Sequence, residues 1–296
     1  MMSTSSKSKK SLPMADPSRT VARLRPAKAI TVREDSTVLE AARMMKSHRA
    51  AAILVTNWEG ALTGIFSDTD AAQRVVSKGL DPARATIASV MTPNPSCVSL
   101  EDSAVDAMDT MLSGKFRHLP VISSQSGNIV GVLNVAKCLH DAIRRAENMS
   151  ASLQQELGAK GDNAMLRGML EKMLSPSLRD VLSAPGEAMP PLVCGNMTVY
   201  EATAYMAQTK RPALVVSSNS EAQNLIGIFT SKDLLLRVIA EDLDVNTTPV
   251  SDVMTPNPES AAPETSVLDA FHIMHDGKFL DLPVVSSDFG RNYGCC

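Results

Sequence analysis

One hexapeptide occurs twice in this chain, and repetition limits the possible folds more than any other feature of the sequence. The residues VMTPNP stand at positions 90–95 and again at 253–258. At the same spacing, GKFRHLPVISS (114–124) aligns with GKFLDLPVVSS (277–287). Chance does not produce two such matches in a chain of 296 residues. The second half of the chain therefore repeats the first.

Each half is itself a repeat. A shorter spacing aligns DSTVLEAARMM (35–45) with DSAVDAMDTML (102–112), and GIFSDTD (64–70) with GVLNVAK (131–137), without a gap. The longer spacing aligns GIFSDTD with GIFTSKD (227–233). The chain thus consists of four copies of one unit of about 60 residues, arranged as two pairs.

Composition excludes several classes of function. The 296 residues are enough for about two domains, and the hydrophobic content of 44% is enough to form their cores. Its net charge of -3 gives no excess of cations for a phosphate backbone, and its aromatic content of 3% leaves few rings for stacking bases. We therefore expect no nucleic-acid partner.

The cysteines and the N-terminal residues bear on the compartment. No two of the five cysteines are spaced as CxxC, which favours neither a disulfide framework nor a thiolate metal site. The cysteine pattern therefore indicates a reducing compartment such as the cytoplasm. No apolar run reaches the ~18 residues of a membrane helix. Residues 1–20 are basic and serine-rich, which is typical of a disordered tail. An organelle transit peptide is the alternative interpretation.

The pattern within a unit predicts an α/β fold. Ser36, Ser103 and Ser266 stand where a hydroxyl would cap a helix. In the first unit, residues 51–55 and 61–66 have the pattern of strands, and a second helix should begin near Ser67 and stop at Gly79. The predicted order is strand, helix, strand, strand, helix.

The unit resembles the cystathionine-β-synthase (CBS) domain family, whose paired units are called Bateman modules. GIFSDTD and GIFTSKD carry its signature of a glycine, two apolar residues, Ser or Thr, two further residues and Asp, and KFRHLPV is similar to its second strand. The resemblance covers roughly residues 24–287. The double pair looks most like plant and algal proteins in which four CBS units precede a Phox/Bem1 domain, with the C-terminus apparently truncated here. The expected divisions are a tail (1–20), unit 1 (21–86), unit 2 (87–147), a helical linker (148–177), unit 3 (178–245) and an incomplete unit 4 (246–296).

The start of the second helix is the candidate ligand site. A helix N-terminus at Ser67 offers free N–H groups to a phosphate, and Asp70 lies one turn further on, where a carboxylate could accept from both ribose hydroxyls. Gly64 would let the backbone approach a base. The alternative is that Ser-x-x-Asp is only a helix cap. The resemblance implies ribose and phosphate contacts for Ser67, Asp70 and Gly64 in unit 1, and for Thr230, Asp233 and Gly227 in unit 3.

Units 2 and 4 depart from this signature. Unit 2 has Asn134 and Lys137 in place of the hydroxyl and the carboxylate, and it could meet a phosphate but not clamp a ribose. In unit 4 DFGRNYGCC (288–296) replaces the expected strand, and no residue matches Asp70. We therefore expect at most two ribose-clamped ligands per chain. We also expect unit 4 to be the least stable part, with Phe271, Met274 and Leu282 partly uncovered.

Four basic residues near the clefts are candidates to neutralise phosphate: Arg117, His118, Lys210 and Arg211. For His118 an ordinary structural role is the alternative. Unit 4 has Leu280 and Asp281 at the positions of Arg117 and His118, so its cleft loses positive charge.

The remaining motifs favour no chemistry. His272, His275 and Asp276 lie within one helical turn, but lack a fourth metal ligand and are typical of a solvated helix face. The sequence contains no nucleophile–base pair and no P-loop, so we predict no enzyme. Residues 146–174 have the composition of two helical pieces with a flexible joint at GAKGDN.

The sequence therefore predicts a non-catalytic regulatory module that binds AMP, ADP, ATP or S-adenosylmethionine, without a tightly bound cofactor, and acts on a protein partner or a second copy of itself. One alternative is an association module with empty clefts, in which Asp70 and Asp233 are only caps. Another is the regulatory part of an inosine-monophosphate dehydrogenase or an energy-sensing kinase. VMTPNP should be a stiff, extended connector, because proline fixes φ and restricts the residue before it.

Overall fold

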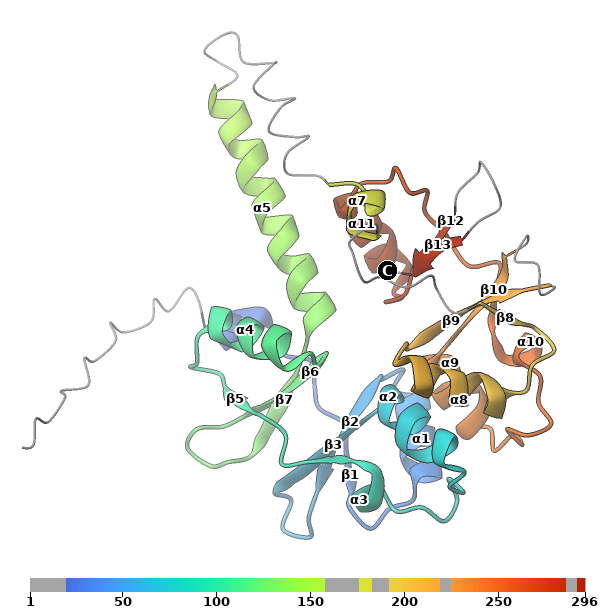
Figure 1. Ribbon diagram of the computed structural model, residues 1–296. Helices are drawn as coiled ribbons and strands as arrows, with labels where there is room; N and C mark the ends of the chain where they lie inside the picture. Colours follow the sequence, from blue (N-terminus) through green and yellow to red (C-terminus); the bar gives the residue numbers. More distant parts are fainter. Residues whose placement is uncertain (1–19, 158–175, 183–191, 219–224, 286–291, 296) are drawn as a thin grey trace, which may run out of the picture.

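The computed structural model describes residues 20–157, 176–182, 192–218, 225–285 and 292–295, and it confirms the mixed α/β fold of tandem units. Figure 1 shows the four units arranged around a centre. The first unit has the predicted order of elements. Its members are β1 (Thr31–Arg33), α1 (Val38–Ser47), β2 (Ala52–Thr56), β3 (Leu62–Ser67) and α2 (Asp68–Asp70), continued by a π-helical turn (Ala71–Val75) and a 3-10 turn (Val76–Lys78).

Units 2 and 3 follow the same order, and unit 4 shows its middle part. Unit 2 contains β5 (Val98–Ser99), α4 (Ala104–Gly114), β6 (His118–Ile122), β7 (Ile129–Asn134) and α5 (Val135–Leu157). Unit 3 contains β8 (Leu192–Cys194), α8 (Val199–Thr209), β9 (Ala213–Ser217), β10 (Leu225–Thr230), α9 (Ser231–Asp233) and a π-helical turn (Leu234–Ile239). Unit 4 contains α11 (Val267–Gly277), β12 (Pro283–Val285) and β13 (Asn292–Cys295).

Within each pair, every unit is covered by a helical turn that precedes the other unit in the sequence. The turn α3 (Ile87–Val90) leads into unit 2 but packs on unit 1, where the Ile87 N–H donates to the Ser36 carbonyl at 2.9 Å. The 3-10 turn Val21–Leu24 leads into unit 1 but packs on unit 2, and its Val21 N–H donates to Asp102 at 2.9 Å. In the second pair, α10 (Val250–Val253) leads into unit 4 but packs on unit 3. The turn α7 (Leu178–Leu182) leads into unit 3 but packs on unit 4.

The repeated hexapeptide forms the edge strand of the first unit of each pair. In the first copy β4 (Thr92–Pro93) pairs antiparallel with β3, and in the second copy β11 (Thr255–Pro256) pairs with β10. An edge position tolerates proline because one side of the strand needs no N–H donor. The middle of the hexapeptide is thus extended, as predicted, and completes two sheets, but its first valine ends a helical turn and Asn94 and Asn257 have positive φ angles of 47° and 46°.

The glycine of the signature is explained by this connector. A Cβ on Gly64 would overlap the sulfur of Met91, and a Cβ on Gly227 would overlap the sulfur of Met254. Each glycine therefore makes room for the methionine of VMTPNP. Contact between these glycines and a base stays a prediction.

Two of the three predicted serine caps are confirmed. The hydroxyls of Ser103 and Ser266 accept the backbone N–H groups of Asp106 and Asp269. In unit 1 the prediction was wrong by one residue, because Thr37 caps α1. The gap-free alignment failed because the loop between β2 and β3 (57–61) is one residue shorter than the loop between β6 and β7 (123–128).

Units 1 and 3 share one hydrophobic core, which the sequence did not indicate. The helices α1 and α8 pack with the second helices of both units, as Figure 1 shows in its lower right part. The fully buried side chains at this junction include Met45 and Phe66 of unit 1 and Met206 and Phe229 of unit 3. Units 2 and 4 have separate, smaller cores and meet through α5 and α11.

Unit 4 has more structure than the sequence predicted. Asn292–Cys295 form a strand that pairs antiparallel with β12, so the expectation of a missing strand was wrong. Glycine, asparagine and cysteine gave a weak strand pattern, but the free edge of β12 supplies hydrogen-bond partners. Leu282 is fully buried, against expectation, whereas Phe271 and Met274 are only partly covered.

The long helix α5 continues the second helix of unit 2 into the linker and confirms the first helical piece up to Leu157. The joint at GAKGDN, the second helical piece and the basic tail lie outside the described residues. Among the described helices, none combines the length and apolar character needed to span a bilayer.

Candidate functional site

The hydroxyl and carboxylate of the signature meet in both units that carry them. The Ser67 hydroxyl donates to Asp70 Oδ2 at 2.7 Å, and the Ser67 N–H donates to the same oxygen at 2.9 Å. In unit 3 the corresponding distances from Thr230 to Asp233 Oδ2 are 2.7 and 3.0 Å. Both pairs are complete capping boxes, so the structural role anticipated for these residues is present.

The capping box uses only one oxygen of each carboxylate. Asp233 Oδ1 accepts the Thr255 hydroxyl at 3.2 Å and lies 3.5 Å from Arg237 Nε. Asp70 Oδ1 lies 3.4 Å from Arg74 Nε. Burial raises the pKa of Asp70, and the hydrogen bond from Ser67 and the charge of Arg74 partly oppose this. The second oxygen is therefore the part of each carboxylate that faces other groups.

Two arginines that the sequence analysis missed connect this carboxylate to the connector. Arg74 donates to the carbonyls of Val90 and Met91 at 3.2 and 2.6 Å, and Arg237 donates to those of Val253 and Met254. Each arginine stands four residues after the signature Asp in both units, and this spacing was the available signal.

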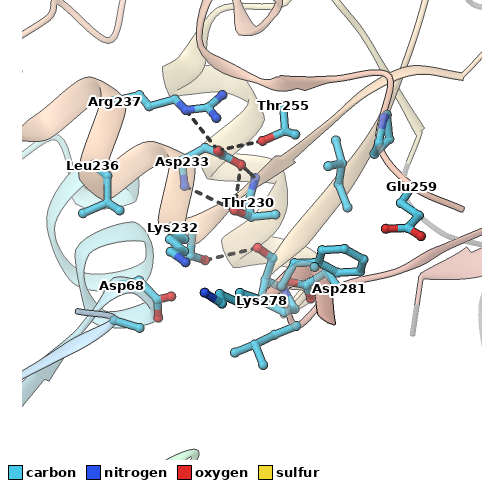
Figure 2. A pocket seen from close by; sticks show the side chains of 18 of the residues that line it. Asp68, Thr230, Lys232, Asp233, Leu236, Arg237, Thr255, Glu259, Lys278 and Asp281 are labelled. Atoms are coloured by element: carbon cyan, nitrogen blue, oxygen red, sulfur yellow. Dashed lines mark hydrogen bonds and ion pairs between the residues drawn. The ribbon is translucent and has the colours of Figure 1, made fainter. Parts of the chain in front are cut away.

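A cavity of about 330 Å³ opens beside Asp233, between units 3 and 4. Figure 2 shows Asp233 and Thr230 on one wall and Lys278 and Asp281 on another. Units 1 and 2 also contribute, through Asp68 and Arg117. Apolar side chains complete the lining, namely Ala51, Pro212, Ile228, Leu236, Pro258, Phe279 and Leu280. Side chains of all four units therefore border one space.

The cavity carries both signs of charge. Its cations are Arg117, Lys232, Arg237 and Lys278, and its carboxylates are Asp68, Asp233, Glu259 and Asp281. The predicted Arg117 is held by Asp68 Oδ1 at 3.0 Å and by the Thr69 hydroxyl at 2.7 Å. It belongs to unit 2, yet it reaches the cavity of the other pair. Lys232 and Lys278 were missed, because the first has Thr69 as its counterpart in unit 1 and the second stands at a helix end.

The other predicted basic residues lie outside this cavity. The His118 ring nitrogen lies 3.1 Å from the Asn134 amide nitrogen, and burial lowers the pKa of His118 to about 4. This favours the structural role given as its alternative. Lys210 ends α8 in a left-handed conformation with φ of 55° and is exposed, and Arg211 follows it. Neither lines the cavity, and a phosphate contact for these residues stays a prediction.

The prediction of a solvated face is confirmed for His275 and Asp276, which are exposed, whereas His272 is only half-buried and both histidines also meet a neighbouring helix. The ring of His275 stacks on His140 of α5 with centroids 3.1 Å apart, and the ring of His272 meets His140 edge-on at 6.1 Å. These histidines therefore form part of the contact between units 2 and 4. Within the described residues no group of three or more His, Cys, Asp or Glu side chains is arranged to hold a metal ion.

Asp281 provides a test of the electrostatics of the cavity. Burial raises its pKa to about 6, the nearby Asp68 and Asp233 add to this, and Arg117 opposes it. Because the folded pKa exceeds the unfolded one, the native state holds the proton more tightly, and stability falls as pH rises from about 4 to about 6. We expect Asp281→Asn to stabilise the protein by about 1–3 kcal/mol at pH 7 and by much less at pH 4.

Urea unfolding of both proteins at the two pH values measures this effect. Asp276→Asn on the exposed end of α11 is the control and should be nearly neutral at both. Equal stability of Asp281→Asn and wild type at pH 7 would contradict the raised pKa.

The repeated units, their exchanged turns and the signature at Ser67 and Thr230 define a four-repeat assembly of one small α/β domain. The family model of the CBS domain matches residues 21–77, 87–141, 186–240 and 250–294. The chain belongs to the CBS-domain family.

Particular relatives support this assignment. The chain is 38% identical over 283 residues to the CBS domain-containing protein CBSCBSPB2 of Arabidopsis thaliana, which covers 93% of this chain and 52% of the relative. It is 31% identical over 290 residues to the Meiotically up-regulated gene 70 protein of Schizosaccharomyces pombe. That match covers 87% of this chain and 39% of the relative. The chain thus spans about half the length of the Arabidopsis relatives it matches. A Phox/Bem1 domain in the remainder stays a prediction.

A solved structure extends the likeness to the arrangement of the units. The protein MJ1225 of Methanocaldococcus jannaschii has a TM-score of 0.65 and is 14% identical, and the match covers 93% of this chain and 96% of the other. At this identity the match concerns the fold.

Proposed function

We propose that this chain is a non-catalytic regulatory module that binds an adenosine nucleotide in the cavity between units 3 and 4. The observation that carries the proposal is the convergence on Asp233 of a hydroxyl, a buried carboxylate oxygen outside the capping box and an empty space of about 330 Å³. This volume lies at the lower end of the range for small-molecule sites. Asp233 Oδ1 would accept the ribose hydroxyls.

The rest of the lining fits the other parts of such a ligand. Ile228 and Leu236 supply apolar surface for a base. Lys232 and Lys278 supply ammonium groups for phosphate, and Arg117 adds a guanidinium from unit 2. Because side chains of all four units border the cavity, a bound nucleotide would favour one arrangement of the units and could transmit its presence to a partner protein.

Unit 1 is the second proposed site, because Ser67 and Asp70 repeat the same geometry. Asp70 does not line the cavity between units 3 and 4. We therefore expect the site at Asp233 to bind first and the site at Asp70 to bind more weakly.

Titration calorimetry of the purified chain against AMP, ADP, ATP and S-adenosylmethionine tests the proposal. We expect saturable binding of at least one of them, with no more than two sites per chain. Inosine monophosphate is the control ligand that keeps ribose and phosphate but changes the base. The completeness of both capping boxes favours the alternative of an association module with empty clefts. If none of the four ligands binds, that alternative is correct.

A further inference from the structure

A second cavity, of about 320 Å³, lies between α5 of unit 2 and the segment that precedes unit 1. One wall is the 3-10 turn Val21–Leu24 with Arg23 and Arg25, and the other is α5 with Asp141, Arg144 and Arg145. In Figure 1 this turn is the blue segment beside α4. Arg144 stands seven residues beyond Lys137, which corresponds to about 10 Å along a helix. The Arg144 end of the cavity is therefore removed from the signature position of unit 2, whereas the Arg25 carbonyl at the other end accepts a hydrogen bond from Lys137.

The charge around this cavity is strongly unbalanced. Four exposed guanidinium groups and one carboxylate border it, and within the described part of the chain none of the four arginines forms an ion pair. Guanidinium groups that are held together repel one another at a cost that an anion between them would remove. The arginine fork also matches the oxygens of a phosphate with paired hydrogen bonds.

Hydrogen bonds join the two walls. Lys137 Nζ donates to the Arg25 carbonyl at 3.0 Å, and Arg145 donates to the Arg23 carbonyl at 3.5 Å. The reciprocal packing of Val21 on Asp102 fixes the turn further. The arginines of both segments are thus presented by backbone that tertiary contacts position, which reduces the entropy lost when a ligand binds.

The other units show that the fold does not require these arginines. The positions of Arg23, Arg144 and Arg145 correspond in unit 1 to Ser89, Ser77 and Lys78. In unit 3 they correspond to Asp252, Ala240 and Glu241. The same backbone therefore carries a nearly neutral or an acidic surface elsewhere in the molecule. The basic cavity is a property of unit 2 alone among these three units.

We infer that this cavity binds a small, multiply charged phosphate anion, either as free pyrophosphate or polyphosphate or as the phosphate chain of a phosphorylated metabolite. Four guanidinium groups can neutralise three to four negative charges, which a single phosphate does not carry. This site is independent of the proposed nucleotide site, because the two cavities share no lining residue.

Calorimetric titration of the full chain with inorganic tripolyphosphate tests the inference. We expect the double variant Arg144→Ala/Arg145→Ala to bind at least tenfold more weakly than wild type, because each lost charge-assisted bond is typically worth a factor of about ten. Arg23→Ala, on the other wall, should weaken binding in the same direction. Arg84→Ala removes an exposed arginine from unit 1 and should change the affinity less than twofold. ATP in place of tripolyphosphate distinguishes a metabolite phosphate chain from a free polyphosphate.

Two controls distinguish binding at this site from binding in the cavity between units 3 and 4 and from an effect of unfolding. Lys232→Ala removes a cation from the cavity between units 3 and 4 and should leave tripolyphosphate binding within twofold of wild type. Arg144→Lys/Arg145→Lys keeps the charge and loses the fork, so an intermediate affinity is expected even if the alanine variant unfolds. Unchanged affinity in the double alanine variant, a loss caused by Lys232→Ala instead, or wild-type binding no tighter than that of sulfate would each overturn the inference.

Discussion

Asp233→Ala is expected to weaken binding of an adenosine nucleotide on the order of 100-fold. The lost carboxylate would have accepted two ribose hydroxyls through charge-assisted hydrogen bonds, each worth roughly 1.5 kcal/mol. Asp233 is 10% exposed at its side chain, so water replaces those bonds poorly. Calorimetry of the variant with the ligand that binds the wild-type chain measures the loss, and Asp70→Ala tests the second site in the same way.

The capping box at Asp233 requires a control, because the same substitution removes a helix cap. Asp269 of α11 also lies three residues after its cap, Ser266, whose hydroxyl it accepts at 2.7 Å, but it does not line the cavity. Asp269→Ala should therefore cost about 1 kcal/mol of folding stability and leave nucleotide affinity unchanged. If Asp233→Ala and Asp269→Ala behave alike, with lower melting temperatures and wild-type affinity, the signature carboxylate is only a cap.

Phe229→Ala is expected to lower the free energy of unfolding by about 3–5 kcal/mol, the usual cost of emptying a fully buried aromatic site. Phe229 belongs to unit 3, but it lies in the core that units 1 and 3 share. The loss should therefore appear in unit 1 as well.

Trp58 makes this coupling measurable, because it is the single tryptophan of the chain and belongs to unit 1. The Arg33 guanidinium lies 3.1 Å from the centre of its ring, a contact that unfolding would break and that tryptophan fluorescence should detect. We expect the fluorescence transition of Phe229→Ala in urea to shift together with its far-UV circular dichroism. Leu112→Ala, at an apolar residue that is 63% exposed, should shift neither appreciably. A fluorescence midpoint at the wild-type value in Phe229→Ala would mean that units 1 and 3 unfold independently.

The sequence predicted the features that depend on local pattern. The repeat, the order of elements, and the meeting of Ser67 with Asp70 and of Thr230 with Asp233 follow from periodicity and from the geometry of a helix start. The error at Thr37 is one residue, within the ordinary uncertainty of loop lengths.

The features that depend on which units meet could not be read from local pattern. Lys278 and Arg117 reach the cavity beside Asp233 because units 4 and 2 are placed there by tertiary packing. Lys210 and Arg211 lie nearer to Asp233 in sequence but do not line it. β13 was missed because its strand character comes from its partner β12 rather than from its own residues.

The exchanged turns have a consequence for the order in which the chain can fold during synthesis. Val21–Leu24 leave the ribosome before the rest of unit 1, yet the carbonyl that Val21 meets belongs to Asp102 in unit 2. Unit 1 in turn waits for Ile87–Val90 and for the strand at Thr92–Pro93. Neither member of the first pair can therefore reach its native contacts alone, and the earliest segment to emerge is among the last to dock. We expect ribosome-stalled chains to acquire protease resistance in steps of one pair rather than one unit, with the first step after the strand at Ile129–Asn134 has emerged.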